Sequence, residues 1–362
     1  MFSSIYYISA NAENMANNEK DPLNRAKKVL KETLGAVPFL ELVSVKAYPG
    51  DAELLVELKY KGRRSDCAVA VKSLGQPKYA REAVYQLERR AAGRPGVYGI
   101  FMAPYISEGA GTILAEKKAG YMDFSGNCRL AFDGIYIERK GAPNAFAVKR
   151  DLRKLYSPKA ARVLRVLLTG ARRVWKMAQL SAEAGVSLGQ TANVKAALAE
   201  REWLDASAPG LRLADPAAVL AQWAREYDFR KNIVRECYSV KSPAETEAGL
   251  EELCAGKGIP FALAGFSAAA RLRPAVRYQR GMAYVGEFRP ELLAAAGIKE
   301  VESGGNILLL LPYDAGVFYG SLKTPGGTVT GAVQTYLDLA GYKGRGEEAA
   351  AEILEHVIKP SW

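Results

Sequence analysis

The chain has 362 residues, of which 49% are apolar and 25% charged, and its formal net charge is +11. This composition is typical of a globular protein, and the length predicts two or three domains. No run of 18 or more apolar residues occurs, which excludes a conventional membrane-spanning helix. One histidine, His356, and four cysteines without CxxC spacing supply too few ligands for zinc sites or histidine-based catalysis. We therefore expect a cytoplasmic protein with buried reduced thiols, a surface histidine, no metal and no cofactor. The cysteines are Cys67, Cys128, Cys237 and Cys254.

Residues 1–20 are predicted to be a disordered tail, and residues 21–148 an α/β domain. Asp21 and Pro22 are typical of the start of a helix, because aspartate caps a helix and proline suits its first turn. Apolar spacing and alternation predict the elements that follow. These are strands over 39–47, 52–59 and 66–72, a helix over 78–92, a strand over 97–103, a helix over 107–118, and a β-rich stretch over 121–138. The order α-β-β-β-α-β is typical of a mixed sheet covered by helices.

Within this domain a pattern resembles the PD-(D/E)xK nucleases. Asp51 and Glu53 stand before a predicted strand, Lys72 ends the next one, and Gln86 lies on the following helix. Such nucleases need a carboxylate two residues before the lysine, so that both side chains share one face and hold Mg²⁺. Ala70 occupies that position here. We therefore predict a restriction-endonuclease-like mixed-sheet domain that is inactive, has no catalytic residues, and serves DNA contact or partner docking.

Positive charge is concentrated in the next stretch. Residues 149–203 contain twelve basic and four acidic residues, a net charge of +8. Charge gathered on one small module indicates phosphate binding. The basic residues are Lys149, Arg150, Arg153, Lys154, Lys159, Arg162, Arg165, Arg172, Arg173, Lys176, Lys195 and Arg201.

Residues 149–215 are predicted to be a winged helix-turn-helix that binds double-stranded DNA. Three helical patterns follow one another between residues 161 and 201, and the last two are joined by a tight turn. In that turn Gly185 suits a left-handed backbone, Val186 fills the angle between the helices, and Ser187 is a helix cap. The stretch from 203 to 214, with Pro209 and Gly210 at its centre, predicts two short strands that form the wing.

Burial of Thr191 and Val194 would turn the N-terminal end of the third helix outward, where such helices enter the major groove. Glutamine and asparagine can each form a bidentate pair with adenine, and arginines and lysines bind phosphates. The predicted DNA-binding residues are Arg172, Arg173, Lys176, Ser187, Leu188, Gly189, Gln190, Asn193, Lys195 and Arg212.

Residues 216–362 are predicted to be an α+β domain. It begins with a helix over 217–227, includes a strand over 306–311, and turns at the glycines 326 and 327. The whole chain is thus expected to be an α/β and α+β multidomain protein.

Four segments together resemble one group of bacterial proteins, the AbiEi-family antitoxins of type IV toxin–antitoxin systems. They read VLRVLLTGARRVWKMAQLSAEAGVSLGQTANVKAALAEREWL, GYMDFSGNCRLAF, ALAGFSAAARLRP and VQTYLDLAGYKGRGEEAA. The resemblance is most specific over residues 155–204 and 260–350. It implies a winged-helix regulator that represses its own operon and counteracts a nucleotidyltransferase toxin encoded nearby. This chain departs from the family pattern in one respect, because a nuclease-like domain precedes the predicted winged helix.

These observations predict that the protein is a non-enzymatic, sequence-specific regulator that binds double-stranded DNA. A homodimer is expected, because paired half-sites suit two-fold protein symmetry. Two alternatives stay open: a Mg²⁺-dependent nuclease targeted by the winged helix, and a DNA-binding scaffold of a mobile element or of replication.

Overall fold

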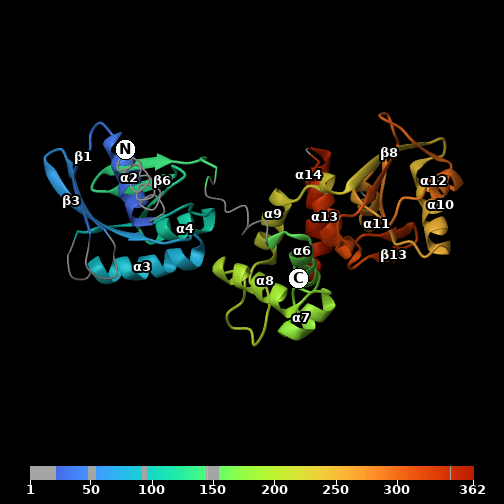
Figure 1. Cartoon of the computed structure of the whole chain (residues 1–362), viewed down its shortest axis with the longest axis horizontal. Coiled ribbons are helices and arrows are strands. Elements are labelled where there is room, and N and C mark those ends of the chain that lie inside the picture. The colour runs from blue at the N-terminus through green and yellow to red at the C-terminus, as the bar shows by residue number, and fades with distance from the viewer. Residues whose placement is uncertain are drawn as a thin grey trace, which may run out of the picture. The chain divides into compact units, whose positions relative to one another are not determined.

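The computed structural model in Figure 1 describes residues 22–47, 54–91, 96–143, 145, 155–274, 276–342 and 344–362. The expected tail over 1–20 lies outside these residues. Two compact units divide the chain, one made by the residues up to 145 and the other by nearly all of the residues from 155 onward. Each unit contains a seven-stranded mixed sheet. No helix among the described residues is both long enough and apolar enough to cross a bilayer.

The sheet of the first unit follows chain order. Its strands β3, β4 and β5 run parallel, and every other neighbouring pair is antiparallel. The strands are β1 (Glu41–Ala47), β2 (Leu54–Tyr60), β3 (Arg63–Val71), β4 (Tyr98–Ala103), β5 (Gly120–Asp123), β6 (Cys128–Phe132) and β7 (Ile135–Arg139).

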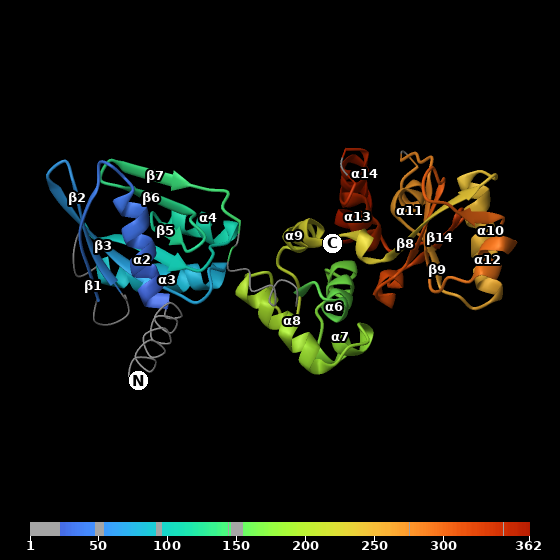
Figure 2. The same cartoon turned by 45° about the horizontal axis from the view of Figure 1, so that its top comes forward.

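Helices cover both faces of this sheet (Figures 1 and 2). Alternation along β3 sends Cys67 and Val69 into a core shared with α2 (Pro22–Gly35). Ala68 and Ala70 point the other way, into a core shared with α3 (Pro77–Ala91) and α4 (Glu108–Glu116). The predicted order of elements and the mixed sheet are confirmed. The expected strand over 66–72 begins three residues early, at Arg63.

The second unit begins with the three-helix segment, residues 155–215. Its helices are α6 (Pro158–Thr169), α7 (Met177–Glu183) and α8 (Leu188–Glu200). After α8 the chain doubles back, and isolated bridges join Leu204 to Leu213 and Trp175 to Leu211. These bridges occupy the stretch where two short strands were expected.

The rest of the second unit is built on a sheet with the strand order β11-β8-β12-β10-β9-β14-β13. Its strands are β8 (Ile233–Ser239), β9 (Phe261–Leu263), β10 (Gly281–Val285), β11 (Ile298–Glu300), β12 (Ile307–Leu311), β13 (Leu322–Thr324) and β14 (Gly327–Val329). The helices are α9 (Pro216–Glu226), α10 (Pro243–Gly256), α11 (Gly265–Leu272), α12 (Pro290–Ala295), α13 (Ala332–Ala340) and α14 (Arg345–Ile353), with short 3-10 and π turns after α9, after β12 and at the end of the chain.

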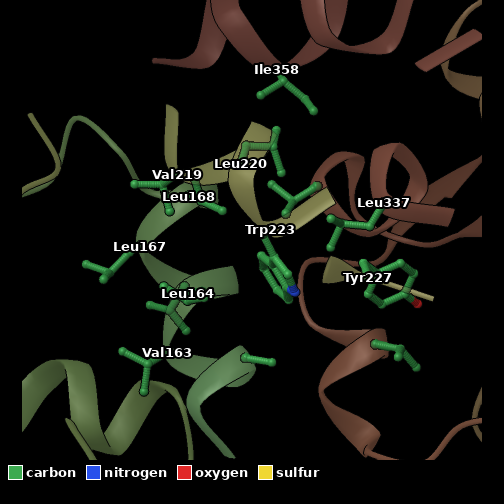
Figure 3. Packing of buried hydrophobic residues seen from close by; sticks show 14 of the residues in the cluster. Val163, Leu164, Leu167, Leu168, Val219, Leu220, Trp223, Tyr227, Leu337 and Ile358 are labelled. Atoms are coloured by element: carbon green, nitrogen blue, oxygen red, sulfur yellow. The ribbon is translucent and has the colours of Figure 1, made fainter. Parts of the chain in front are cut away.

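One hydrophobic core joins the three-helix segment to this C-terminal part. In Figure 3 the side chains of α6, α9 and α13 converge around Trp223, with Leu164 on one side and Leu337 on another. Trp223 is 1% exposed, and Tyr284 and Leu310 of the sheet belong to the same core. The two domains expected on either side of residues 215 and 216 therefore share one continuous core.

All four cysteines are free and buried, as predicted. Burial raises the pKa of the Cys67 thiol to about 12, and that of Cys254 to about 11. His356 is half exposed, and its Nε2 lies 3.6 Å from a carboxylate oxygen of Glu352, which precedes it by one helical turn. Its predicted surface position is confirmed.

Candidate nucleic-acid interface

The turn between α7 and α8 has the predicted geometry. Gly185 has a φ of +61°, a backbone conformation that side chains disfavour. The Ser187 hydroxyl accepts a hydrogen bond from the Gln190 amide at 3.2 Å, which caps the start of α8. Val186 is half-buried against the core, and its carbonyl accepts a hydrogen bond from the Ser181 hydroxyl. The turn therefore fixes the direction in which α8 leaves α7.

Helix α8 buries one narrow face. Thr191, Val194 and Leu198 are the buried residues, at most 2% exposed. Asn193 lies on the side opposite these residues and is exposed, whereas Gln190 lies at the edge of the buried face and is half-buried. The remaining predicted contact residues at this end, Leu188 and Gly189, are also exposed, Leu188 by 55%. The N-terminal end of α8 thus presents amide and apolar groups together at the surface.

Two arginines precede α7, and they differ in what they contact. Arg173 is exposed and stacks on Trp175, with its guanidinium carbon 3.9 Å from the ring centroid. Arg172 is also exposed, but its guanidinium donates hydrogen bonds to the carbonyls of Pro360 and Trp362. Stacking pre-orders the Arg173 side chain while leaving its charge at the surface. Arg173 is therefore better placed than Arg172 to bind a phosphate.

Two lysines among the predicted contacts are exposed. Lys176 stands immediately before α7, and its amide donates to the side-chain oxygen of Gln179 at 3.4 Å. Lys195 lies on α8, two residues after Asn193. Both ammonium groups can reach an anion without displacing a buried contact.

The stretch after α8 is held to the start of α7 by backbone hydrogen bonds. Trp175 and Leu211 exchange two of these bonds, each of 2.8 Å. Arg212, predicted to contact DNA, forms an ion pair with Asp205 and is partly exposed. Hydrogen bonds from the Ser207 hydroxyl, and then from Arg212, lower the pKa of the Asp205 carboxyl to about 2. At neutral pH the Arg212 guanidinium is consequently paired within its own loop.

Part of the predicted positive block does not face solvent. Arg165 is 1% exposed and donates to the Gln334 amide oxygen at 2.6 and 3.0 Å. Arg162 is half-buried and forms a bidentate pair with Asp314 at 2.8 to 3.0 Å. The expectation that the block is a single phosphate-binding surface is wrong for these two arginines, because their partners are acceptors in the C-terminal part. Arg201 is also buried, and the first four members, Lys149, Arg150, Arg153 and Lys154, lie outside the described residues.

A buried polar cluster that was not predicted from the sequence lies next to Arg165. The carboxyl of Asp338 accepts hydrogen bonds of 2.8 Å from Tyr227, Tyr284 and Gln334. Desolvation raises the pKa of this carboxyl to about 6, against the opposing effect of these donors and of Arg165. A recognisable signal was present: Gln334 and Asp338 stand four residues apart in an otherwise mostly apolar helix, so both face the same core.

The nuclease-like positions are only partly described. Asp51 and Glu53 lie outside the described residues. Ala70 is 1% exposed and packs in the core beneath α3 and α4. Lys72 and Gln86 are half-buried, and the side-chain oxygen of Gln86 is buried without a hydrogen-bond partner. Across the described parts of the chain, His, Cys, Asp and Glu side chains form no group of three that could hold a metal ion.

Comparison with known proteins identifies one relationship. Neither the curated proteins nor the solved structures include a match to this chain. Residues 212–359, about two fifths of the chain, match the AbiEi_2 family model. The match begins at the end of the three-helix segment and covers the C-terminal part that packs on α6. The family is described as a transcriptional regulator, the AbiEi antitoxin of a type IV toxin–antitoxin system.

Proposed function

We propose that the chain is a sequence-specific, double-stranded DNA-binding transcriptional regulator, and that the three-helix segment is its winged helix-turn-helix. The observation that carries this proposal is the exposed N-terminal end of α8, where Asn193 and Gln190 accompany Leu188 above a buried Thr191 and Val194. Amide side chains at this position can pair with adenine in the major groove. Arg173 and Lys176 would bind the flanking phosphates and orient the helix.

The family match supports a more specific role. We infer that the protein is an antitoxin that represses its own operon and opposes a nucleotidyltransferase toxin encoded nearby. It would bind its operator as a homodimer, so that each three-helix segment reads one half-site. The first unit, in this proposal, binds and does not cleave, since Ala70 supplies no carboxylate for a metal. Plasmid cleavage in Mg²⁺ or Mn²⁺ that disappears in Lys72→Ala would contradict this.

The proposal is tested by binding to duplexes from the region upstream of the gene, against scrambled duplexes of equal length. Asn193→Ala should weaken binding to the cognate duplex by about tenfold to hundredfold, the equivalent of about 1–3 kcal/mol of lost base readout. Binding to the scrambled duplex should stay nearly unchanged. Equal losses on both duplexes would reject base readout by Asn193 and favour a sequence-independent scaffold.

A second arm separates phosphate binding from base reading. Arg173→Ala should weaken binding to both duplexes and lower the slope of log affinity against log salt by about one. Arg230→Ala is the matched control, because Arg230 is also an exposed arginine near an aromatic ring, 5.9 Å from the centroid of Phe229. Loss of the same charge there should leave DNA affinity unchanged, and equal effects of the two variants would contradict a localised contact.

A further inference from the structure

The turn between β2 and β3 carries an unusual backbone. Strand β2 ends at Tyr60 and β3 begins at Arg63, and these two residues pair directly. The two residues between them, Lys61 and Gly62, have φ values of +49° and +80°. A two-residue hairpin turn with both central residues left-handed favours asparagine or aspartate followed by glycine. Lysine at the first position is therefore a poor conformational choice, which points to a use for its charge.

Positive charge dominates this tip. Four of the six residues from 59 to 64 are basic, and we call these six residues the basic hairpin tip. Lys59 pairs with Glu41 and Arg64 with Glu57, at 2.9 and 2.7 Å, and both basic side chains are exposed. Pairs whose cation is this exposed to solvent contribute little free energy, so a phosphate can compete for either cation.

The other two cations have no carboxylate partner among the described residues. Arg63 is exposed and makes no ion pair with them, and the Lys61 ammonium lies 5.3 Å from the centre of the Tyr60 ring. Tyr60 in turn packs edge-to-face on Phe39, which is 53% exposed. Strand pairing and this aromatic pair hold the tip in shape, so its charges are ordered before any partner arrives.

We propose that the basic hairpin tip is a second DNA contact, which binds the phosphate backbone of a duplex independently of base sequence. The tip joins β2 to β3, next to the edge strand β1 of the first sheet (Figure 2). A two-stranded ribbon fits the major groove of B-form DNA, whereas the deep groove of A-form RNA is too narrow for one. The inference rests on the proposed DNA-binding function but uses none of the residues of the three-helix segment.

Lys61→Asn tests the inference, because the substitution should weaken DNA binding without lowering the stability of the fold. Asparagine suits the left-handed turn, so the melting temperature should stay equal or rise. Affinity for both cognate and scrambled duplexes should fall by about three- to tenfold at 150 mM salt, because one phosphate contact is lost. With Arg63→Ala added, the salt slope should fall by about two in total.

Lys118→Asn is the matched control. Lys118 is likewise an exposed lysine with positive φ, +54°, at the end of α4. The substitution removes the same charge and relieves the same backbone strain, and it should leave DNA affinity unchanged. Equal losses of DNA affinity in Lys61→Asn and Lys118→Asn would mean that only the net charge of the protein matters, and would overturn the inference.

The outcomes also separate this inference from the proposed function. If the wild-type chain binds no duplex, the proposed function fails and the hairpin contact fails with it. If Arg173→Ala weakens binding while Lys61→Asn with Arg63→Ala does not, the hairpin contact alone is wrong. A hairpin variant that loses affinity for RNA or anionic vesicles but not for duplex DNA also overturns it.

Discussion

Helices α6 and α8 belong to the same three-helix segment and use their polar side chains in opposite ways. Helix α6 is buried almost all round, and Arg162 and Arg165 reach from it to acceptors in the C-terminal part. Helix α8 buries a single face and leaves Asn193 and Lys195 at the surface. Local charge therefore does not identify a DNA-binding helix, because the position of the acceptors decides whether an arginine can bind a phosphate or is held by a protein group.

The largest expected effect comes from breaking the attachment of α6. Arg165→Ala should lower the free energy of unfolding by about 3 kcal/mol, because it opens a cavity and leaves the buried Gln334 oxygen without its donor. Urea denaturation measures this change. Lys195→Ala on α8 is the control and should alter stability by less than about 0.5 kcal/mol. Similar losses of unfolding free energy in the two variants would contradict the claim that the polar side chains of α6, unlike those of α8, hold the fold together.

Stability should also depend on pH through Asp338, which shares Gln334 with the α6 residue Arg165. The pKa of Asp338 in the folded chain is raised from 3.8 to about 6, so the folded state binds this proton more tightly than the unfolded state. Its contribution therefore makes the chain more stable as pH falls from above 6 toward 4, by roughly 2–3 kcal/mol.

Asp338→Asn isolates that contribution, since the amide oxygen can still accept the tyrosine hydrogen bonds but cannot titrate. The unfolding free energy of wild type minus that of the variant, measured from pH 7.5 to pH 4.5, should increase as the carboxyl becomes protonated. A difference between the two proteins that is independent of pH would show that Asp338 does not titrate in this range.

A smaller effect is expected at the turn that orients α8. Gly185→Ala should cost about 1 kcal/mol of stability, because alanine resists the left-handed backbone at φ +61°. Gly185→Asn should cost less, since asparagine tolerates this conformation. Thermal melts of the two variants provide the measurement. An alanine variant as stable as wild type would mean that the turn does not hold α8 by its backbone geometry.

Much of the architecture could be predicted, because it depends on local patterns. Alternation and helical spacing located the strands of the first unit, and the small residue Gly185 and the hydroxyl of Ser187 marked the turn before α8. The exposed face of α8 followed from the burial of Thr191 and Val194. Each of these features is decided by residues close together in the chain.

The direction of the α6 arginines could not be predicted in the same way. Lys159, Arg162 and Arg165 are spaced by three residues in the sequence, a pattern that also suits a solvent-exposed stripe, although Arg165 is buried in the structure. The acceptors Asp314 and Gln334 lie some 150 residues or more further along the chain. The basic hairpin tip was missed for another reason: a lysine–glycine pair is not a typical two-residue hairpin turn.

The core around Trp223 determines how this chain can be divided. Removing residues 216–362 would expose the apolar side of α6 and leave Arg165 without its acceptor, so we expect that the three-helix segment would not fold by itself. For the same reason, a molecule that binds the C-terminal part would contact a body whose hydrophobic core includes α6. A change in packing around Trp223 would therefore act directly on α6, because both belong to one close-packed core.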